Sequence, residues 1–334
     1  MSYVLFTPGP VNLDSRVKDA AVSVDLCHRQ EDFLEVIDRV REKLLRISCK
    51  EDANVSLLQG SGALAVESGL SSFVMGNVLL IVNGYYSHRM WESLKNRNGV
   101  YLTVLKFSDD CVPDASCLKS AMAGKDWVVL AHHETGVGLL TPLGLVCDLA
   151  AFLGVRVLVD AVSSFGCHHV DTRADVICFN SNKCLESIPG VAIVIWDSSL
   201  LFRDSCIPCL DVRKYCDNIE YTANTNSMLA LDVALDLWFQ EDRKHRYDKL
   251  SESIRDIGSR TFKLFLDDNY SSVATSFYVG DGNKYSRLYS AAKESGYIIY
   301  SGKIPGQFRV CNMGVLITED NIRNLFGVLY ESVC

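Results

Sequence analysis

The sequence lacks the segments that would place a protein in or on a membrane. It has no run of about 18 uninterrupted apolar residues, and its opening residues, MSYVLFTPGPV, carry no basic leader. It also lacks a clustered basic patch, because 41 Asp and Glu outnumber 33 Lys and Arg and give a net charge of −8. Binding to nucleic acid or to an anionic membrane would need such a patch. We therefore expect a cytoplasmic protein that binds neither.

A regular cysteine framework is also missing. The 13 cysteines are scattered over the chain and their number is odd, so we expect no disulfide scaffold. Cys206 and Cys209 have the spacing of a redox motif, yet no second CxxC pair completes a zinc site. Two adjacent histidine pairs are present, at His132, His133, His168 and His169. Neighbouring side chains on a strand point to opposite faces, so at most one histidine of each pair could serve a given site, and we predict no metal.

Short apolar runs alternate with helical segments between about residues 55 and 196. The runs are NVSLLQ, NVLLIVN, GVYLTVLKF, DWVVLAHH, VRVLVD, ADVICF and VAIVIW. Continuous rather than alternating apolar runs are typical of strands buried on both faces, as in a parallel sheet covered by helices. Segments such as ALAVESGLSSFV and LGLVCDLAAFLG have the helical spacing between them. This pattern predicts an open, mostly parallel α/β sheet, which binds ligands beyond the carboxyl ends of its strands.

The pattern changes after about residue 225. A long helical stretch, residues 228–268, is followed by the strand-like segments SSVATSFYV and YIIYSG and by the helical segments KYSRLYSAAKESG and DNIRNLFGVLYES. We predict a large domain over residues 14–240. A smaller α+β domain is expected over residues 241–334, joined by the N-terminal segment 1–13.

Three features follow the predicted strands. QGSGA, residues 59–63, opens a helix whose free N–H groups suit an anion, although it matches neither the dinucleotide fingerprint nor the P-loop. Asp160 ends one strand, and Lys183 in FNSNKCLESIPG follows the next. Singly, Asp160 is explained as a helix cap and Lys183 as a surface lysine. Together the three match pyridoxal 5′-phosphate, which needs a phosphate site, a carboxylate for its ring nitrogen and an amine for a Schiff base.

The segment SFGCHHVDTRADVICFNSNKCLESIPGVAIVI resembles the lysine region of fold-type I, class V aminotransferases. The resemblance extends over nearly the whole chain, through FTPGPV, LLQGSGALAVE, IVNGYYSHRM, HHETGVGLLTP, VDAVSSFG, GYIIYSGK and FRVCNMG. It implies a pyridoxal-phosphate enzyme, a large and a small domain, and a homodimer with shared active sites. Within the family the blocks are most similar to those of enzymes that move the amino group of 2-aminoethylphosphonate to pyruvate, giving phosphonoacetaldehyde and alanine.

The resemblance also implies a role for individual residues. Lys183 would form the Schiff base and Asp160 would pair with the pyridine nitrogen. The remaining cofactor-binding positions are Ser61, Gly62 and Ala63 for the phosphate, Tyr86 for stacking, Thr135 for the phenolic oxygen and Thr222 for the phosphate of the second subunit. Arg309 would hold the anionic group of the substrate, and His28 and Arg29 would add a second contact unless they only open a helix. Taken singly, Tyr86, Thr135 and Arg309 are better explained as a core aromatic, a turn residue and a surface partner of an acid, but their joint occurrence in these blocks favours the functional interpretation.

The chain departs from the family at three positions. Asn224 and Asn226 replace a proline and a histidine in TANTN, and Asn180 replaces a serine before the lysine. These changes bear on substrate identity and phosphate affinity more than on the chemistry. Three alternatives stay open at the level of the sequence: an alanine- or serine-glyoxylate aminotransferase, a desulfurase-like lyase on the same fold, and a cofactor-binding relative without turnover.

Overall fold

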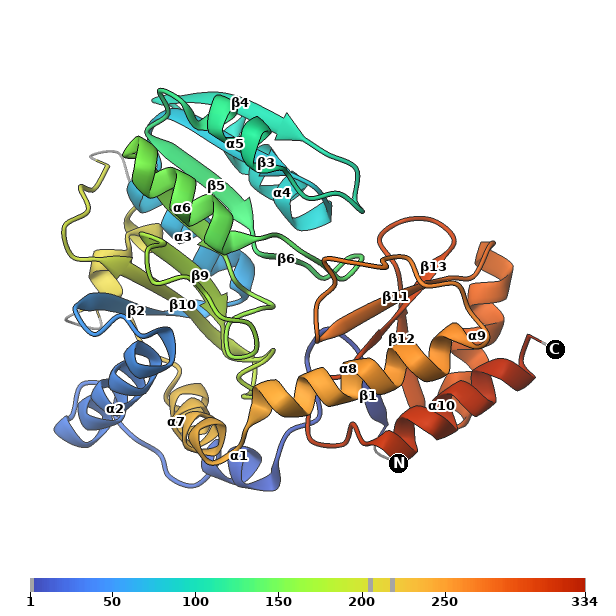
Figure 1. Ribbon diagram of the computed structural model, residues 1–334. Helices are drawn as coiled ribbons and strands as arrows, with labels where there is room; N and C mark the ends of the chain where they lie inside the picture. Colours follow the sequence, from blue (N-terminus) through green and yellow to red (C-terminus); the bar gives the residue numbers. More distant parts are fainter. Residues whose placement is uncertain (1–2, 204–206, 217–219, 334) are drawn as a thin grey trace.

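A computed structural model describes residues 3–203, 207–216 and 220–333. Its larger sheet has seven strands in the order β2-β10-β9-β8-β5-β3-β4 (Figure 1). The bounds are β2 (Ala53–Gly60), β3 (Gly76–Val82), β4 (Val100–Lys106), β5 (Trp127–Ala131), β8 (Arg156–Asp160), β9 (Val176–Asn180) and β10 (Gly190–Asp197). Strand β10 runs antiparallel to β2 and β9, and the other neighbouring pairs are parallel. The prediction of a mostly parallel α/β sheet is confirmed.

Strand β4 differs from the expectation that each apolar run is buried on both faces. It lies at the end of the sheet beside β3, and its Tyr101 and Val104 are 71% and 39% exposed. A strand at the end of a sheet has a neighbour on one side only, so an apolar run there keeps part of its surface in water. Apolar continuity predicted this strand but not its position in the sheet.

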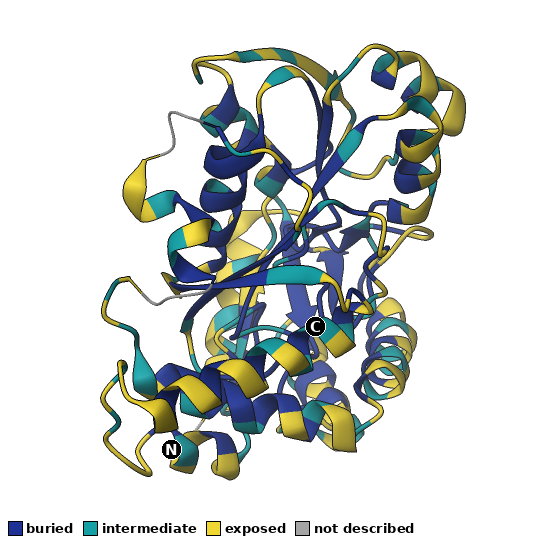
Figure 2. Cartoon of the chain, turned by 90° about the vertical axis from the view of Figure 1, so that its left-hand side faces the viewer, coloured by how far each residue is buried: buried dark blue, intermediate teal, exposed yellow. Residues whose placement is uncertain are grey.

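Helices cover both faces of the large sheet. One face carries α2 (Glu31–Ser48), α5 (Ala115–Met122), α6 (Leu143–Leu153) and α7 (Thr225–Gln240), and the other carries α3 (Gly62–Phe73) and α4 (Tyr85–Leu94). Successive residues of β3 alternate between the two cores, Leu79 in the first and Leu80 in the second. Figure 2 shows these helices buried on their inner sides and exposed outside. Helix α1 (Ser15–Ala20) packs on α7, and the 3-10 turns η1 (Pro208–Leu210) and η2 (Val212–Tyr215) pack near α3.

A smaller unit is built around a four-stranded sheet in the order β1-β12-β13-β11. The strands are β1 (Val4–Phe6), β11 (Ala274–Tyr278), β12 (Tyr297–Ser301) and β13 (Gln307–Cys311). Helices α8 (Arg243–Ser259), α9 (Gly282–Glu294) and α10 (Glu319–Glu331) share a hydrophobic core with this sheet. The N-terminal β1 pairs in parallel with β12, so both ends of the chain meet in this unit (Figure 1). The division of the chain at residues 14 and 241 stays a prediction.

The helical stretch predicted over residues 228–268 is two helices in the structure. Helix α7 ends at Gln240 and α8 begins at Arg243, because the side chain of Asp242 accepts a hydrogen bond from the His245 N–H at 3.0 Å and starts a new helix. Helix α8 then leads from the large sheet into the smaller unit (Figure 1). A short hairpin, β6 (His133–Glu134) and β7 (Leu139–Leu140), projects from the large sheet toward the same unit.

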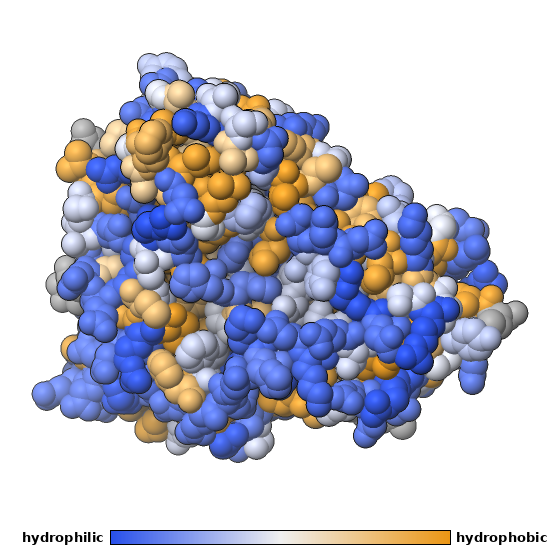
Figure 3. Space-filling view, in the orientation of Figure 1, coloured by the Kyte–Doolittle hydropathy of each residue, from blue (hydrophilic) through white to orange (hydrophobic). Residues whose placement is uncertain are grey.

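The surface carries both polar and apolar side chains, as expected for a chain with 48% hydrophobic and 22% charged residues (Figure 3). Figure 3 shows mainly polar side chains over the lower part of the face that carries α8, with apolar side chains gathered higher up, in the region of α5 and α6. Phe152 of α6 is 72% exposed there. In the part of the chain that the structure describes, none of the helices has the length and apolar content needed to span a bilayer.

Candidate active site

The ends of two neighbouring parallel strands bring Asp160 and Lys183 to one edge of the large sheet. Strand β8 ends at Asp160, and its parallel neighbour β9 ends at Asn180, three residues before Lys183. The ammonium nitrogen Nζ of Lys183 lies 5.6 Å from the ring centroid of Tyr86, in the first turn of α4. The structure thus brings together the lysine, the carboxylate and the aromatic ring that the sequence singled out.

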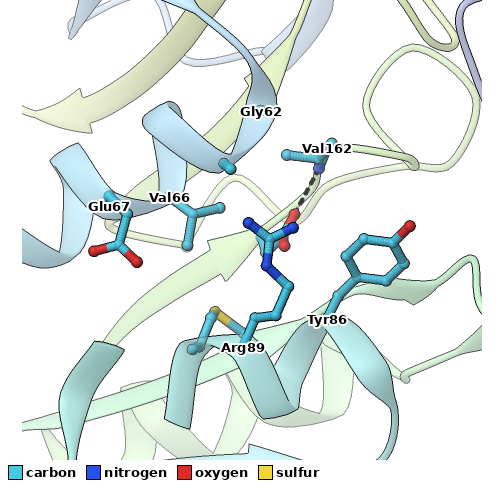
Figure 4. Close-up of a pocket in the computed structure, with 9 residues that line it drawn as sticks. Gly62, Val66, Glu67, Tyr86, Arg89 and Val162 are labelled. Atoms are coloured by element: carbon cyan, nitrogen blue, oxygen red, sulfur yellow. Dashed lines mark hydrogen bonds between the residues drawn. The ribbon is translucent and has the colours of Figure 1, made fainter. Parts of the chain in front are cut away.

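A pocket lies between α3, α4 and the loop after β8. It is lined by Gly62, Ala63, Val66, Glu67, Tyr86, Arg89, Met90, Asp160 and Val162. Figure 4 shows Arg89 reaching from α4 into this space, toward the loop that carries Val162. The guanidinium of Arg89 adds a positive charge that sequence reasoning missed (Figure 4). Four predicted residues, Gly62, Ala63, Tyr86 and Asp160, line one pocket.

The first turn of α3 forms one wall of the pocket through Gly62 and Ala63. Helix α3 begins at Gly62, and the preceding Ser61 makes no side-chain capping bond to it. The first N–H groups of a helix have no partner within the helix and lie at the positive end of its dipole, so they attract an anion. A Cβ atom at Gly62 would lie 2.6 Å from Cγ1 of Val162. Glycine is therefore required where α3 approaches the loop after β8.

Asp160 stands at the base of the pocket with a perturbed carboxyl group. Burial raises the pKa of this carboxyl, while a hydrogen bond from the Val162 N–H to Oδ1, at 2.9 Å, and the charges of Lys183 and Arg89 oppose the rise. No ion pair is formed by Asp160 within the described residues. A partly buried carboxylate without such a pair is suited to hold a cationic N–H of a bound ring.

The β6–β7 hairpin contributes buried polar atoms that lack partners among the described residues. These atoms include Oγ1 of Thr135 and Nε2 of His133. The Nδ1 atom of His133 lies 3.0 Å from the carbonyl oxygen of Ser163, so Nδ1 carries the proton and Nε2 is an acceptor. Burial lowers the pKa of His133 well below its usual value, which keeps the ring neutral. Buried polar atoms are normally hydrogen-bonded, so Oγ1 of Thr135 and Nε2 of His133 are exceptions among the described residues.

Glu134 positions Tyr86, a role that sequence reasoning missed. Its carboxylate is buried and accepts hydrogen bonds from the N–H groups of Tyr86 at 2.9 Å and Ser87 at 2.6 Å, in the first turn of α4. A Cβ atom at Gly84 would lie 2.4 Å from Cδ of Glu134, so only glycine allows this approach. The sequence signal is the acid in HHETG, close behind the apolar run DWVVLAHH, although the resemblance to the family assigns it no role.

Glu186 fixes the lysine loop to the smaller unit and was also missed. Its Oε1 accepts hydrogen bonds from the Tyr247 hydroxyl at 2.6 Å, from Arg246 Nη2 at 2.8 Å and from the Gly314 N–H at 2.8 Å. Glu186 has a φ of 54°, a left-handed conformation that is uncommon outside glycine. The three contacts explain how this backbone is held, three residues after Lys183.

Arg309 belongs to strand β13 of the smaller unit, is 3% exposed, and reaches the β6–β7 hairpin of the large unit with its guanidinium. Its Nε donates to the carbonyl oxygen of Ser301 at 3.0 Å, and its Nη1 donates to that of Thr135 at 2.6 Å. No carboxylate lies within 4.0 Å of its guanidinium among the described residues. A buried cation whose protein contacts are all neutral is suited to bind an anionic ligand with its remaining Nη2.

Six predicted residues do not line the pocket: Ser61, Thr135, Lys183, Arg309, Thr222 and Arg29. Thr222 is exposed and precedes α7, and Arg29 is exposed with its Nε 3.2 Å from Nε2 of His28. Neither lines the pocket described above. Cys206, the first cysteine of the CxxC pair, falls outside the described residues, whereas Cys209 is a free, exposed thiol.

The residues that depart from the family pattern have local structural partners. Asn224 caps α7 by accepting from the Ser227 N–H at 3.1 Å. The Nδ2 of Asn226 donates to the carbonyl oxygen of Ala21 at 2.5 Å. Asn180 donates through Nδ2 to Oδ1 of Asn182, at 2.6 Å. We therefore attribute the substitutions to the support of α7 and of the lysine loop.

Similarity to known proteins is extensive in both sequence and structure. Residues 16–204 match the family described as Aminotransferase class-V. The 2-aminoethylphosphonate–pyruvate transaminase of Klebsiella pneumoniae is 31% identical, over 96% of this chain and 95% of that protein. A second enzyme of that name, from Burkholderia lata, is 32% identical over 90% and 86% of the two chains.

Solved structures give the same assignment of the fold. An alanine–glyoxylate aminotransferase from Nostoc superposes with a TM-score of 0.89 at 25% identity, over 100% of this chain and 96% of that one. A ureidoglycine–glyoxylate aminotransferase from Bacillus subtilis superposes with a TM-score of 0.91 at 20% identity, over 100% and 93% of the two chains, which supports the fold alone. The fold-type I architecture predicted from the sequence is confirmed, and the chain belongs to the class-V aminotransferase family.

Proposed function

We propose that this chain binds pyridoxal 5′-phosphate and transfers the amino group of 2-aminoethylphosphonate to pyruvate, giving phosphonoacetaldehyde and alanine. The observation that carries the proposal is the near full-length similarity to transaminases named for these two substrates. The site adds physical support, because the pocket has a carboxylate and the start of a helix, and Nζ of Lys183 lies 5.6 Å from the ring centroid of Tyr86 in its wall; these are the groups that this cofactor requires.

The residues present fit the cofactor. The unpaired N–H groups of Gly62 and Ala63 suit its phosphate, and the carboxylate of Asp160 suits its ring N–H. The buried Oγ1 of Thr135 has no partner among the described residues and suits the phenolic oxygen. Tyr86 lines the same pocket and would cover the ring, and Lys183 would supply the amine.

The protein's part in the reaction is to hold charges and to move protons. When bound, the cofactor supplies an aldehyde that takes over the amino group and a ring that accepts the electrons released from the substrate carbon. Nζ of Lys183 acts as a general base that removes the proton from the carbon bearing the amino group. Asp160 keeps a proton on the ring nitrogen, because the negative charge of its carboxylate raises the pKa of that N–H group.

Arg309 would orient the substrate by its anionic end. Its Nε and Nη1 are held by two main-chain carbonyl groups, so the guanidinium plane is fixed before the substrate arrives. A fixed planar donor is suited to an oxygen of a phosphonate or carboxylate. Arg309 contacts Thr135 in the β6–β7 hairpin. We propose that a small substrate held there by its anionic end directs its amino end toward Lys183.

We also infer a homodimer with shared active sites. Thr222 is exposed and lies outside the pocket of its own chain, which supports a contribution to the phosphate site of a second copy. The cytoplasmic location expected from the sequence stays a prediction.

A half-reaction tests the assignment of the donor. Purified protein loaded with pyridoxal 5′-phosphate is mixed with 2-aminoethylphosphonate in the absence of pyruvate, and the absorbance of the bound cofactor is followed. We expect the band of the lysine-bound cofactor to disappear and phosphonoacetaldehyde to form in one equivalent. If L-alanine or L-serine reacts readily while 2-aminoethylphosphonate does not, the chain is a glyoxylate-type aminotransferase instead.

A further inference from the structure

A second cation reaches the turn of the β6–β7 hairpin beside Arg309. The backbone N–H of Lys303, in the loop between β12 and β13, donates to the carbonyl oxygen of Gly136 at 3.3 Å. Arg309 contacts the carbonyl oxygen of the preceding residue, Thr135. A Cβ atom at Gly136 would lie 3.0 Å from Cγ of Lys303, so the lysine packs closely against this turn. Two cationic residues of the smaller unit therefore meet one turn of the large unit.

A line of aromatic rings connects this lysine to the pocket. Nζ of Lys303 lies 4.2 Å from the ring centroid of Tyr85. The ring of Tyr85 contacts that of Tyr86 edge to face, with centroids 5.3 Å apart. The centroid of the Tyr86 ring lies in turn 5.6 Å from Nζ of Lys183. Lys303 of the smaller unit is thus linked to Lys183 through the rings of Tyr85 and Tyr86.

The charge of Lys303 is not neutralised by the protein contacts that surround it. No carboxylate lies within 4.0 Å of its ammonium among the described residues. Asp281 lines a second pocket together with Lys303. Its carboxylate caps α9 by accepting a hydrogen bond from the Lys284 N–H at 2.8 Å, and it forms no ion pair with Lys303. The contact with Tyr85 is a cation–π interaction, which leaves the ammonium protons free to bind an anion.

We propose that Lys303 is the second cation that binds the anionic end of the donor, and that it selects a phosphonate over a carboxylate. This inference rests on the proposed function. A phosphonate, like a phosphate monoester, approaches a double negative charge near neutral pH and offers three acceptor oxygens, whereas a carboxylate has one charge and two oxygens. Arg309 alone matches a carboxylate. A phosphonate has a charge and an oxygen left over, and Lys303 provides the donor for them.

The experiment compares two donors in half-reactions with cofactor-loaded enzyme. Lys303→Met removes the charge and keeps an unbranched side chain, and we expect the efficiency with 2-aminoethylphosphonate to fall about ten-fold or more, as for a lost charged hydrogen bond. With L-alanine, the carboxylate-bearing product that drives the reverse half-reaction, we expect a change below about three-fold. Lys303→Arg, which keeps the charge, should stay within about three-fold of the wild type with both donors.

A matched control distinguishes the specific role of Lys303 from a general effect of removing a lysine. Lys293 of α9 also carries a cation–π contact, 6.0 Å from the Tyr289 ring centroid, and Lys293→Met should leave both donors unaffected. If the wild type uses 2-aminoethylphosphonate but Lys303→Met loses efficiency equally with both donors, or with neither, the role of Lys303 is wrong. If the wild type uses L-alanine and not 2-aminoethylphosphonate, the donor assignment is wrong, and the selectivity for phosphonate is lost with it.

Discussion

At the scale of single residues, the site contains a carboxylate, that of Asp160, whose burial costs free energy and whose charge the proposed reaction needs. Burial raises the pKa of this carboxyl, which the proposed reaction needs in its ionised form. The folded protein without cofactor therefore bears a desolvation cost at neutral pH. That cost is offset when a cationic ring N–H binds.

Asp160→Asn should separate stability from turnover. Because the pKa of Asp160 is raised in the folded state, the carboxylate destabilises the cofactor-free protein above that pKa, and the effect vanishes below its unfolded value of about 3.9. We expect the variant to unfold at a higher temperature than the wild type at pH 7, and to lose this advantage near pH 4. Turnover should fall on the order of 100-fold or more. An unchanged turnover would remove Asp160 from the mechanism.

Arg309→Lys should affect the substrate and spare the cofactor. A lysine cannot reproduce the contacts to Ser301 and Thr135, so its charge would no longer be fixed in a plane. We expect efficiency with 2-aminoethylphosphonate to fall about ten-fold or more while the absorbance of the bound cofactor is unchanged. The control is Arg323→Lys, at an exposed ion pair with Asp320. A loss of cofactor binding in the Arg309 variant would contradict the assigned role.

Sequence reasoning found the residues that follow strands and missed those that act through distant contacts. Lys183 and Asp160 could be predicted because each follows a recognisable apolar strand and parallel strands share one edge. The role of Glu134 depends on α4, 47 and 48 residues earlier in the chain. That of Glu186 depends on contacts 60 to 128 residues away. Periodicity carries no information on such pairings.

At the scale of elements, the orientation of α4 depends on one buried carboxylate. Glu134 accepts two N–H groups of the first turn of α4, next to the Tyr86 ring that lines the pocket. A carboxylate at this end of a helix is favoured by the helix dipole as well as by its hydrogen bonds. Strand pairing then fixes the hairpin that carries Glu134, since β6 pairs with β7.

Glu134→Gln should lower the free energy of unfolding and weaken cofactor binding without abolishing it. A glutamine amide accepts one N–H and directs its own NH₂ group at the other, so we expect a loss of about 1–3 kcal/mol in the free energy of unfolding. Denaturant unfolding of the cofactor-free protein measures this, and cofactor titration should show weaker binding because Tyr86 is less well fixed. Glu92→Gln, at an exposed site on the same helix, should have no measurable effect. Equal stability of both variants would refute the capping role.

The directions and limits of several elements were also beyond the sequence. The apolar run of β10 predicts a strand but not that it runs antiparallel to both neighbours. Apolar spacing continues through residues 228–268, so the break at Asp242 appears only in the capping bond of α8. Both features arise from hydrogen bonds rather than from the pattern of apolar residues.

At the scale of the whole molecule, two buried histidines, His132 and His133, and the partly buried His168 make stability depend on pH. Burial lowers the pKa of His132 to about 3 and that of His168 to about 4, and it lowers the pKa of His133 well below its usual value. Their rings lie near one another, with centroids of His132 and His133 each 6.2 Å from that of His168. All three are neutral in the folded protein and become protonated in the unfolded chain below about pH 6.5.

The free energy of unfolding should therefore fall as the pH drops from about 6.5 toward 4. The folded-state pKa values lie below the unfolded value, so the unfolded chain binds more protons in this range and each histidine contributes a loss of up to about 1.4 kcal/mol per pH unit. Denaturant unfolding of the cofactor-free protein at pH 7, 5.5 and 4.5 measures the slope. His168→Gln should reduce it, whereas the exposed His88→Gln should not. A flat profile over this range would contradict neutral buried rings.

The most direct test of the central claim is to locate the covalent attachment of the cofactor. Protein loaded with pyridoxal 5′-phosphate is reduced with borohydride and digested, and the peptides are analysed by mass spectrometry. We predict that the reduced cofactor is found on the peptide that contains Lys183, and that Lys183→Ala protein carries none while still binding the cofactor reversibly. Stable attachment to a different lysine, or reduced wild-type protein that carries no cofactor, would contradict the account.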